Sequence, residues 1–295
     1  MSKLLARFAR FLFETHDARR MRKQTYDTSD LRIQTDIPYI ADGTEEHLLD
    51  IYRPKQASTN LPLIVNIHGG ALVASYKNVN SWFNHEWARR GYTVVSLNYR
   101  HLPQTTLIHQ VEDIMSALSF LSANRNLYGL NLDHCYITGD SAGALLAFFV
   151  LSLEGSRKLR DAFCVKSSGI TFRAAGLISI MLDTQRHDLA AFLNDIVSDA
   201  ADSGKPYLPF ILNPTAMLQE THLPPLCLVT SDEDIIQKDT LKFDKSLTEA
   251  QKEHRLLNFG KSKGKRLEHV FAVQYPMWQE SRQVYEEIDS FFRQQ

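Results

Sequence analysis

Ser141 lies at the centre of the pentapeptide Gly-Asp-Ser-Ala-Gly, residues 139–143, a pattern that is typical of a catalytic serine. An apolar strand-like run precedes it at 135–138, and an apolar helix-like run follows at 144–151. On a sharp strand-to-helix turn such a serine has its hydroxyl raised clear of the sheet, and the helix N-terminus behind it stabilises negative charge. The pattern predicts that Ser141 attacks acyl carbons; a turn of small residues that only closes a βα unit is the alternative.

A second motif, His-Gly-Gly-Ala at residues 68–71, directly follows the apolar run 63–67, which predicts a central strand. Glycines at the end of a strand leave backbone N–H groups unshielded, so they can point at the oxygen of a substrate. We therefore expect an oxyanion hole built from the main chain. A glycine turn beside a buried histidine is the alternative, and the presence of both motifs in one chain argues against it.

An acid and then a histidine should follow the serine along the chain if the three form a triad on such an elbow. The strand-like run 226–230 ends in the acidic cluster 231–234, and His269 follows later. Both lie after strand-like segments, at the edge where an α/β sheet carries its chemistry. This order and placement favour a triad over an exposed acidic loop and an ordinary member of the chain's 11 histidines.

These residues resemble the α/β-hydrolases of the hormone-sensitive-lipase-like group, the His-Gly-Gly-Gly carboxylesterases. The resemblance covers about residues 45–295 and is carried by further segments as well as by the two glycine motifs. They are Leu-Asp-Ile-Tyr-Arg-Pro at 49–54, Asn-Tyr-Arg-His-Leu-Pro-Gln at 98–104, the acidic pair Glu112-Asp113, and Pro224-Pro225.

The resemblance implies a role for each member of the triad. Ser141 matches the nucleophile, and His269 matches the general base. Asp234 falls in register with the family's Asp-Pro-Leu, which makes it the expected acid, with Asp232 as the alternative.

The same resemblance implies that the backbone amides of Gly69, Gly70 and Ala142 form the oxyanion hole. The chain departs from the family at three positions, none of which removes a catalytic group. Ala71 replaces a third glycine, Gln104 replaces a glutamate after proline, and Val270 replaces the commoner glycine after the histidine.

The predicted function is hydrolysis of carboxylic esters with short-to-medium acyl chains, through a Ser-Asp-His triad and an acyl-enzyme intermediate. Neither a metal nor a cofactor is expected. An amidase, an arylformamidase or a peptidase would use the same triad, and a relative that had lost catalysis would bind a small ligand in the old pocket. All three triad residues are present, which favours an enzyme.

The composition fits an enzyme acting on a small-molecule ester. A net charge of −1 argues against a nucleic-acid partner. Three scattered cysteines do not make a disulfide framework, and no Cys or His spacing indicates a metal site. No run approaches the ~18 apolar residues of a transmembrane span. We therefore expect a cytoplasmic setting, whereas the oligomeric state is not readable from these features.

Apolar strands, among them 92–97 and 174–180, alternate with helix-like segments from residue 45 onward. This alternation predicts a mostly parallel central sheet with helices on both faces and a helical cap. We assign residues 41–182 and 216–295 to this α/β-hydrolase core and 183–215 to a lid. Within the lid, 189–197 is helix-like, and Phe192, Tyr207 and Phe210 suggest an apolar acyl site. Residues 1–40 are assigned to an N-terminal helical cap segment. Its amphipathic, basic part at 1–23 has apolar residues at helical spacing: Leu4, Leu5, Phe8, Phe11 and Leu12. This part either covers the site or makes weak contact with a membrane surface.

Overall fold

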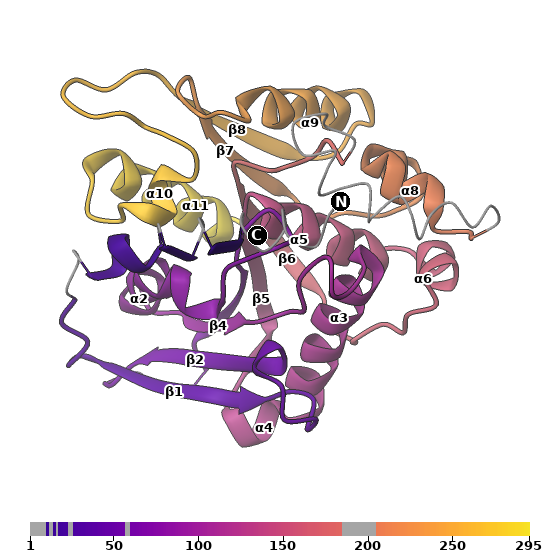
Figure 1. Cartoon of the computed structure of the whole chain (residues 1–295), viewed down its shortest axis with the longest axis horizontal. Coiled ribbons are helices and arrows are strands. Elements are labelled where there is room, and N and C mark those ends of the chain that lie inside the picture. Colours follow the sequence, from indigo (N-terminus) through magenta and orange to yellow (C-terminus); the bar gives the residue numbers. More distant parts are fainter. Residues whose placement is uncertain (1–9, 12–13, 16, 23–25, 57–59, 185–204) are drawn as a thin grey trace.

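The computed structural model contains one eight-stranded sheet in its described part, with the order β1-β2-β4-β3-β5-β6-β7-β8 (Figure 1). β1 and β2 pair antiparallel, as do β2 and β4, and all the other neighbours are parallel. The predicted α/β fold with a mostly parallel sheet is confirmed. The structure describes residues 10–11, 14–15, 17–22, 26–56, 60–184 and 205–295. The strands are β1 (Leu31–Pro38), β2 (Leu48–Pro54), β3 (Pro62–Ile67), β4 (Thr93–Leu97), β5 (Asn131–Asp140), β6 (Phe172–Ile178), β7 (Leu226–Ser231) and β8 (His254–Phe259).

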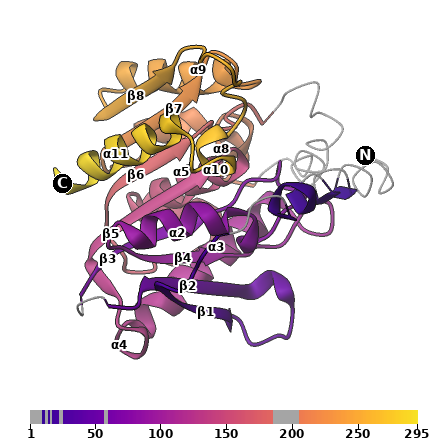
Figure 2. The same ribbon diagram turned by 90° about the vertical axis from the view of Figure 1, so that its left-hand side faces the viewer.

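Helices cover both faces of the sheet. One face carries α2 (Ser81–Arg89), α10 (Phe271–Gln274) and α11 (Gln279–Arg293), and Figure 2 shows α2 and α11 crossing in front of the strands. The other face carries α3 (Leu107–Ala123), α5 (Ala142–Glu154) and α9 (Gln237–Glu249), with α6 (Arg157–Phe163) beside α5. The remaining short helices are η1 (Glu45–His47), η2 (Lys77–Asn80), α4 (Arg125–Tyr128), α8 (Leu208–Leu212) and η4 (Pro214–Gln219).

The burial of these elements explains their sequences. Every residue of β4 is buried, as expected for a parallel strand covered on both faces. α5 is apolar around its whole circumference, and all of its residues except Glu154 are buried. Such a helix lies inside a protein rather than on its surface. The helix that follows Ser141 is therefore fixed in the core, which gives the serine a rigid support.

The predicted strands at 63–67, 92–97, 174–180 and 226–230 agree with β3, β4, β6 and β7 to within two residues. The structure corrects the boundary at residue 40, because residues 31–38 of the expected cap segment form β1. Alternating Leu31, Ile33 and Ile37 along this stretch are typical of a half-buried edge strand. The sheet therefore begins ten residues before the predicted core.

The two expected cap segments are described only in part. The helix expected at 189–197, with Phe192, lies outside the described residues, as do Leu4, Leu5, Phe8 and Leu12. Residues 17–22 are helical. Tyr207 and Phe210, which we expected at an apolar acyl site, pack their rings against Phe163 of α6 at centroid distances of 5.8 and 6.3 Å. Among the helices described, none has the length and apolarity needed to cross a bilayer.

Candidate active site

Ser141 forms the sharp turn between β5 and α5, with φ 53° and ψ −119°. This backbone conformation is rare for a residue with a side chain and persists only where the surroundings enforce it. The enforcement comes from close packing at Gly143, where a Cβ atom would lie 2.2 Å from the carbonyl oxygen of Ile67 and 2.5 Å from that of His68. The small residues of the pentapeptide thus let the elbow sit directly against the end of β3.

The three residues of the predicted triad lie in one line of hydrogen bonds. His269 Nε2 is 2.9 Å from Ser141 Oγ, and His269 Nδ1 is 2.8 Å from Asp234 Oδ1. The Asp234 side chain is 1% exposed and that of His269 is 23% exposed, so solvent reaches the histidine but not the acid. Asp232, the alternative acid, is exposed and bonds Gln237 instead.

The environment of Asp234 favours its ionised form. Burial opposes ionisation, but the hydrogen bond and positive charge of His269, with bonds from Ser179 and the Ile236 N–H, outweigh burial and hold the pKa of Asp234 below its ordinary value. Thr230 Oγ1 donates to the second carboxylate oxygen at 3.2 Å. An ionised, immobile carboxylate fixes the orientation of the imidazole and stabilises it when it becomes positively charged.

The loop that carries His269 is tied to the ends of two strands. The Ser231 hydroxyl donates to the Leu267 carbonyl, and the Leu267 N–H donates to Glu233 Oε2 at 2.8 Å. On the other side of the histidine, the Val270 N–H donates to Ser179 Oγ at 3.2 Å. Val270, where the family more often has glycine, adopts φ 52°. The sequence motifs gave no sign of Ser179 or Glu233, since each acts on a segment far away in the chain.

The backbone N–H groups of the oxyanion motif at residues 68–71 differ in whether a protein acceptor already binds them. The Gly69 N–H donates to Asp140 Oδ1 at 3.2 Å, so a protein acceptor already engages it. Within the described residues, the N–H groups of Gly70 and Ala71 have no protein acceptor. Ala142 is the first residue of α5 and has no acceptor within its helix. In the described part of the chain, the amides of the two glycine motifs left without a protein acceptor therefore include those of Gly70, Ala71 and Ala142.

The turn after Gly70 has little freedom. Gly70 has φ 120°, and a Cβ atom there would lie 2.1 Å from the carbonyl oxygen of Ala74. Ala71 and Leu72 follow at φ 52° and 66°, so two residues with side chains adopt the left-handed conformation in succession. Ala71, which stands where the resembling family has a third glycine, thus adopts a conformation that a glycine favours.

Asp140, the residue before the serine, is a second buried carboxyl group at the site. Burial raises its pKa to about 6, although Asn80, His269, the Gly69 N–H and Arg20 all favour the ionised form. Asn80 Nδ2 donates to Asp140 Oδ1 at 2.6 Å. The same oxygen therefore holds the Gly69 amide and the Asn80 side chain together.

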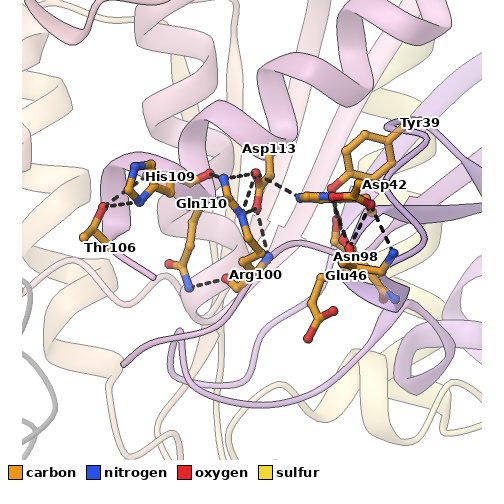
Figure 3. A network of polar contacts seen from close by, with 11 residues as sticks. Tyr39, Asp42, Glu46, Asn98, Arg100, Thr106, His109, Gln110 and Asp113 are labelled. Carbon is orange, nitrogen blue, oxygen red and sulfur yellow. Dashed lines mark hydrogen bonds and ion pairs between the residues drawn. The ribbon is translucent and has the colours of Figure 1, made fainter. Parts of the chain in front are cut away.

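A polar network behind the turn supports it from the side of α3 (Figure 3). Arg100 makes a two-pronged ion pair with the buried Asp113, and Gln110 Nε2 donates to the carbonyl oxygens of Arg100 at 2.7 Å and Leu72 at 2.8 Å. Tyr39 Oη donates to the Asn98 carbonyl at 2.8 Å. Arg100 and Asp113 belong to the segments that carried the family resemblance, so part of the resemblance consists of the support for this turn.

The residues that the structure describes contain no cluster of three or more His, Cys, Asp or Glu side chains suited to a metal ion. His68, a buried histidine of the oxyanion motif, packs against an aromatic ring. Burial lowers the pKa of His68 to about 4, and its ring stacks on Tyr99 at 4.5 Å.

Comparison with known proteins finds similarity to esterases and to a formamidase. The BD-FAE family matches residues 49–187. Isoprenylcysteine alpha-carbonyl methylesterase ICME of Arabidopsis thaliana is 32% identical over 112 residues, which are 38% of this chain and 26% of that protein. Kynurenine formamidase of Danio rerio is 30% identical over 141 residues, covering 46% of this chain and 45% of that protein. The chain thus spans less than half the length of these curated relatives.

Among solved structures, esterase B from Lactobacillus rhamnosis, inhibited with a tributyrin phosphonate, is similar over almost the whole chain. The TM-score is 0.91 at 26% identity, with 98% of this chain and 94% of that chain covered. The predicted resemblance to α/β-hydrolase carboxylesterases is therefore confirmed.

Proposed function

We propose that this carboxylesterase-like α/β-hydrolase cleaves small-molecule carboxylic esters with Ser141 as the nucleophile. The observation that carries the proposal is the line of hydrogen bonds from Asp234 through His269 to the Ser141 hydroxyl, 2.8 and 2.9 Å long. A serine hydroxyl is a weak nucleophile until an adjacent base takes its proton, and this arrangement supplies that base.

In the proposed reaction, His269 removes the Ser141 proton as Oγ attacks the ester carbonyl. Asp234 holds the imidazole in the tautomer with a proton on Nδ1 and stabilises the imidazolium that forms. The imidazolium then gives its proton to the leaving alcohol, which yields an acyl-enzyme. Water, deprotonated by His269, releases the acid and restores the serine hydroxyl.

The amides of Gly70, Ala71 and Ala142 are the donors we assign to the oxyanion. Among the described residues, the N–H groups of Gly70 and Ala71 have no protein acceptor, and Ala142 has none within its helix. Gly69, which the sequence also suggested, contributes through its bond to Asp140, which fixes the start of the turn. One such donor contributes about 10²–10³ in rate in other serine hydrolases.

The proposal extends to esters of short-to-medium acyl chains, on the basis of the family resemblance and of the likeness to an esterase inhibited by a tributyrin phosphonate. A second candidate is hydrolysis of an N-formyl aromatic amide. It is favoured by the likeness to kynurenine formamidase, since the same acyl-enzyme chemistry serves an ester or an amide.

The test is turnover of p-nitrophenyl esters from acetate to dodecanoate, beside an N-formyl aromatic amine, by the wild-type protein and Ser141→Ala. Ester turnover that disappears in a folded Ser141→Ala variant supports the proposal, and the acyl-length optimum defines the preferred chain. Turnover of the formyl amide alone favours the second candidate. Absence of turnover on all of these substrates contradicts both.

A further inference from the structure

Arg20, in the helical segment 17–22, is a buried cation at 7% exposure. A buried guanidinium is costly unless it is paired. Its Nη2 donates to the Val79 carbonyl at 3.1 Å, and its Nη1 donates to the Gln274 carbonyl at 3.5 Å. Asp17 lies 3.7 Å away, and the guanidinium stacks over Trp82 at 5.3 Å. The two-pronged donor geometry of arginine suits it to bind two carbonyls at once.

The first of these carbonyls belongs to the oxyanion side of the site. Val79 lies in η2, directly before Asn80. Asn80 Nδ2 donates to Asp140 Oδ1 at 2.6 Å, and the same oxygen accepts the Gly69 N–H at 3.2 Å. A chain of short contacts therefore runs from Arg20 through η2 to Asp140, the residue before the nucleophile. It continues from Asp140 to Gly69, the first glycine of the turn at residues 68–75, which we call the oxyanion turn.

The second carbonyl belongs to the histidine side. Gln274 is the last residue of α10, which begins two residues after His269. In Figure 1, the 17–22 segment (indigo) lies between α10 and α2, and the contacts of Arg20 with Gln274 and Trp82 agree with that placement. One side chain thus connects the short helix that precedes Asn80 with the short helix that follows His269.

The same helical segment makes another contact with the oxyanion turn. Ser75 Oγ donates to Asp17 Oδ2 at 3.0 Å, and Ser75 has φ 77° at the end of that turn. Arg19 and Arg22, by contrast, are exposed on the segment. Of the three arginines in the segment, Arg20 is the one that is buried. Arg20 and Asp17 contact segments of the active site.

We propose that Arg20 is a positioning residue. It fixes the oxyanion turn relative to the histidine loop, the segment from Leu267 to Gln274 that carries His269. The inference rests on the proposed hydrolysis at Ser141. It gives the N-terminal segment a role inside the catalytic framework, whether or not that segment also covers the substrate. Arg20 touches no reacting atom, so its loss should slow the chemical step without weakening substrate binding.

The charge of Arg20 acts in the same direction as its contacts. It favours the carboxylate form of Asp140, together with Asn80, His269 and the Gly69 N–H. A charged Asp140 is the stronger acceptor for the Gly69 amide. Removal of the guanidinium should therefore loosen the start of the oxyanion turn electrostatically as well as mechanically.

The experiment compares Arg20→Met with Arg22→Met, which removes the same charge from the same segment at an exposed position. We expect kcat on a p-nitrophenyl ester to fall about 10- to 100-fold in Arg20→Met, with KM within about threefold, because small displacements of catalytic groups cost this much. Arg22→Met should stay within about twofold of wild type, and Arg20→Lys should recover part of kcat by keeping the charge and one donor.

Equal kcat in folded Arg20→Met and Arg22→Met overturns the proposal, and so does a rise in KM at unchanged kcat. If Arg20→Met does not fold, Arg20→Lys carries the test: a fall in its kcat beyond that of Arg22→Met supports the proposal, and no fall overturns it. If wild type hydrolyses none of the substrates, the proposed function fails separately. Amide hydrogen exchange in 70–80 and 270–275 then decides: faster exchange in Arg20→Met than in Arg22→Met supports the proposal, and equal exchange overturns it.

Discussion

Asp234 on the histidine side of the site and Asp140 on the oxyanion side are both buried aspartates, with 7% and 5% of the whole residue exposed. On the histidine side, donors around Asp234 outweigh burial, and its pKa lies below the ordinary value. On the oxyanion side, burial dominates, and the pKa of Asp140 rises to about 6. The first side is built to stay charged while the proton moves, whereas the second holds a carboxyl whose protonation changes within an accessible pH range.

The largest expected effect comes from the acid. Asp234→Asn should lower kcat by about 10³–10⁴, because an amide in this position favours the wrong histidine tautomer. Asp232→Asn makes the same chemical change two residues away, on a side chain that bonds Gln237, and should leave kcat within about twofold. Steady-state kinetics on one p-nitrophenyl ester measures both. A larger loss in Asp232→Asn than in Asp234→Asn would reverse the assignment of the acid.

A smaller effect is expected from the support of the histidine loop. Glu233→Ala removes the acceptor of the Leu267 N–H and should lower kcat about tenfold through misplacement of His269. Glu233→Gln keeps an acceptor oxygen and should restore most of the rate. Glu268→Ala is the matched control, because Glu268 neighbours His269 but is exposed and pairs only with Arg266 among the described residues. If both alanine variants lose the same activity, proximity to His269 rather than the Leu267 bond explains the loss.

A third effect concerns stability rather than the rate and should distinguish the oxyanion side. Asp140 keeps its proton in the folded state up to a pH of about 6, whereas its ordinary pKa is 3.8. Its contribution to stability is therefore fully present below that ordinary value and is lost as the pH rises through about 6. This loss is on the order of 2–3 kcal/mol. Asp140→Asn cannot titrate, so its melting temperature should fall less than that of wild type between pH 4 and pH 7.

Between pH 4 and pH 7, the change in melting temperature should differ between wild type and Asp140→Asn by roughly 5 °C, given the size of the chain. Asp133→Asn, at an exposed position of the same strand, provides the control and should follow wild type. Thermal unfolding at several pH values measures all three. Parallel curves for wild type and Asp140→Asn would mean that Asp140 is already ionised in acid and that the two sides do not differ in the way described.

The sequence predicted the parts of the molecule that local patterns determine. Apolar runs located β3, β4, β6 and β7 to within two residues, and the elbow pattern located the turn at Ser141. The edge strand β1 was assigned to the cap although its alternation was present in the sequence, because a half-polar edge strand gives a weaker signal than a buried one.

The relations between distant segments could not be predicted in the same way. Which aspartate reaches His269, and whether the Gly69 amide is free, depend on side-chain directions that only the assembled loops define. Arg20 and Asn80 act on atoms about 60 residues or more away along the chain. Such residues carry no motif, since their function comes from the packing around them rather than from their neighbours in sequence.

Covalent trapping of the serine tests the central claim most directly. The wild-type protein is treated with a fluorophosphonate, and the labelled peptide is identified by mass spectrometry alongside Ser141→Ala and His269→Ala. The account predicts one equivalent of label on Ser141, much slower labelling in His269→Ala, and none in Ser141→Ala. Label on another residue, or ester turnover by a protein whose Ser141 is never labelled, would contradict it.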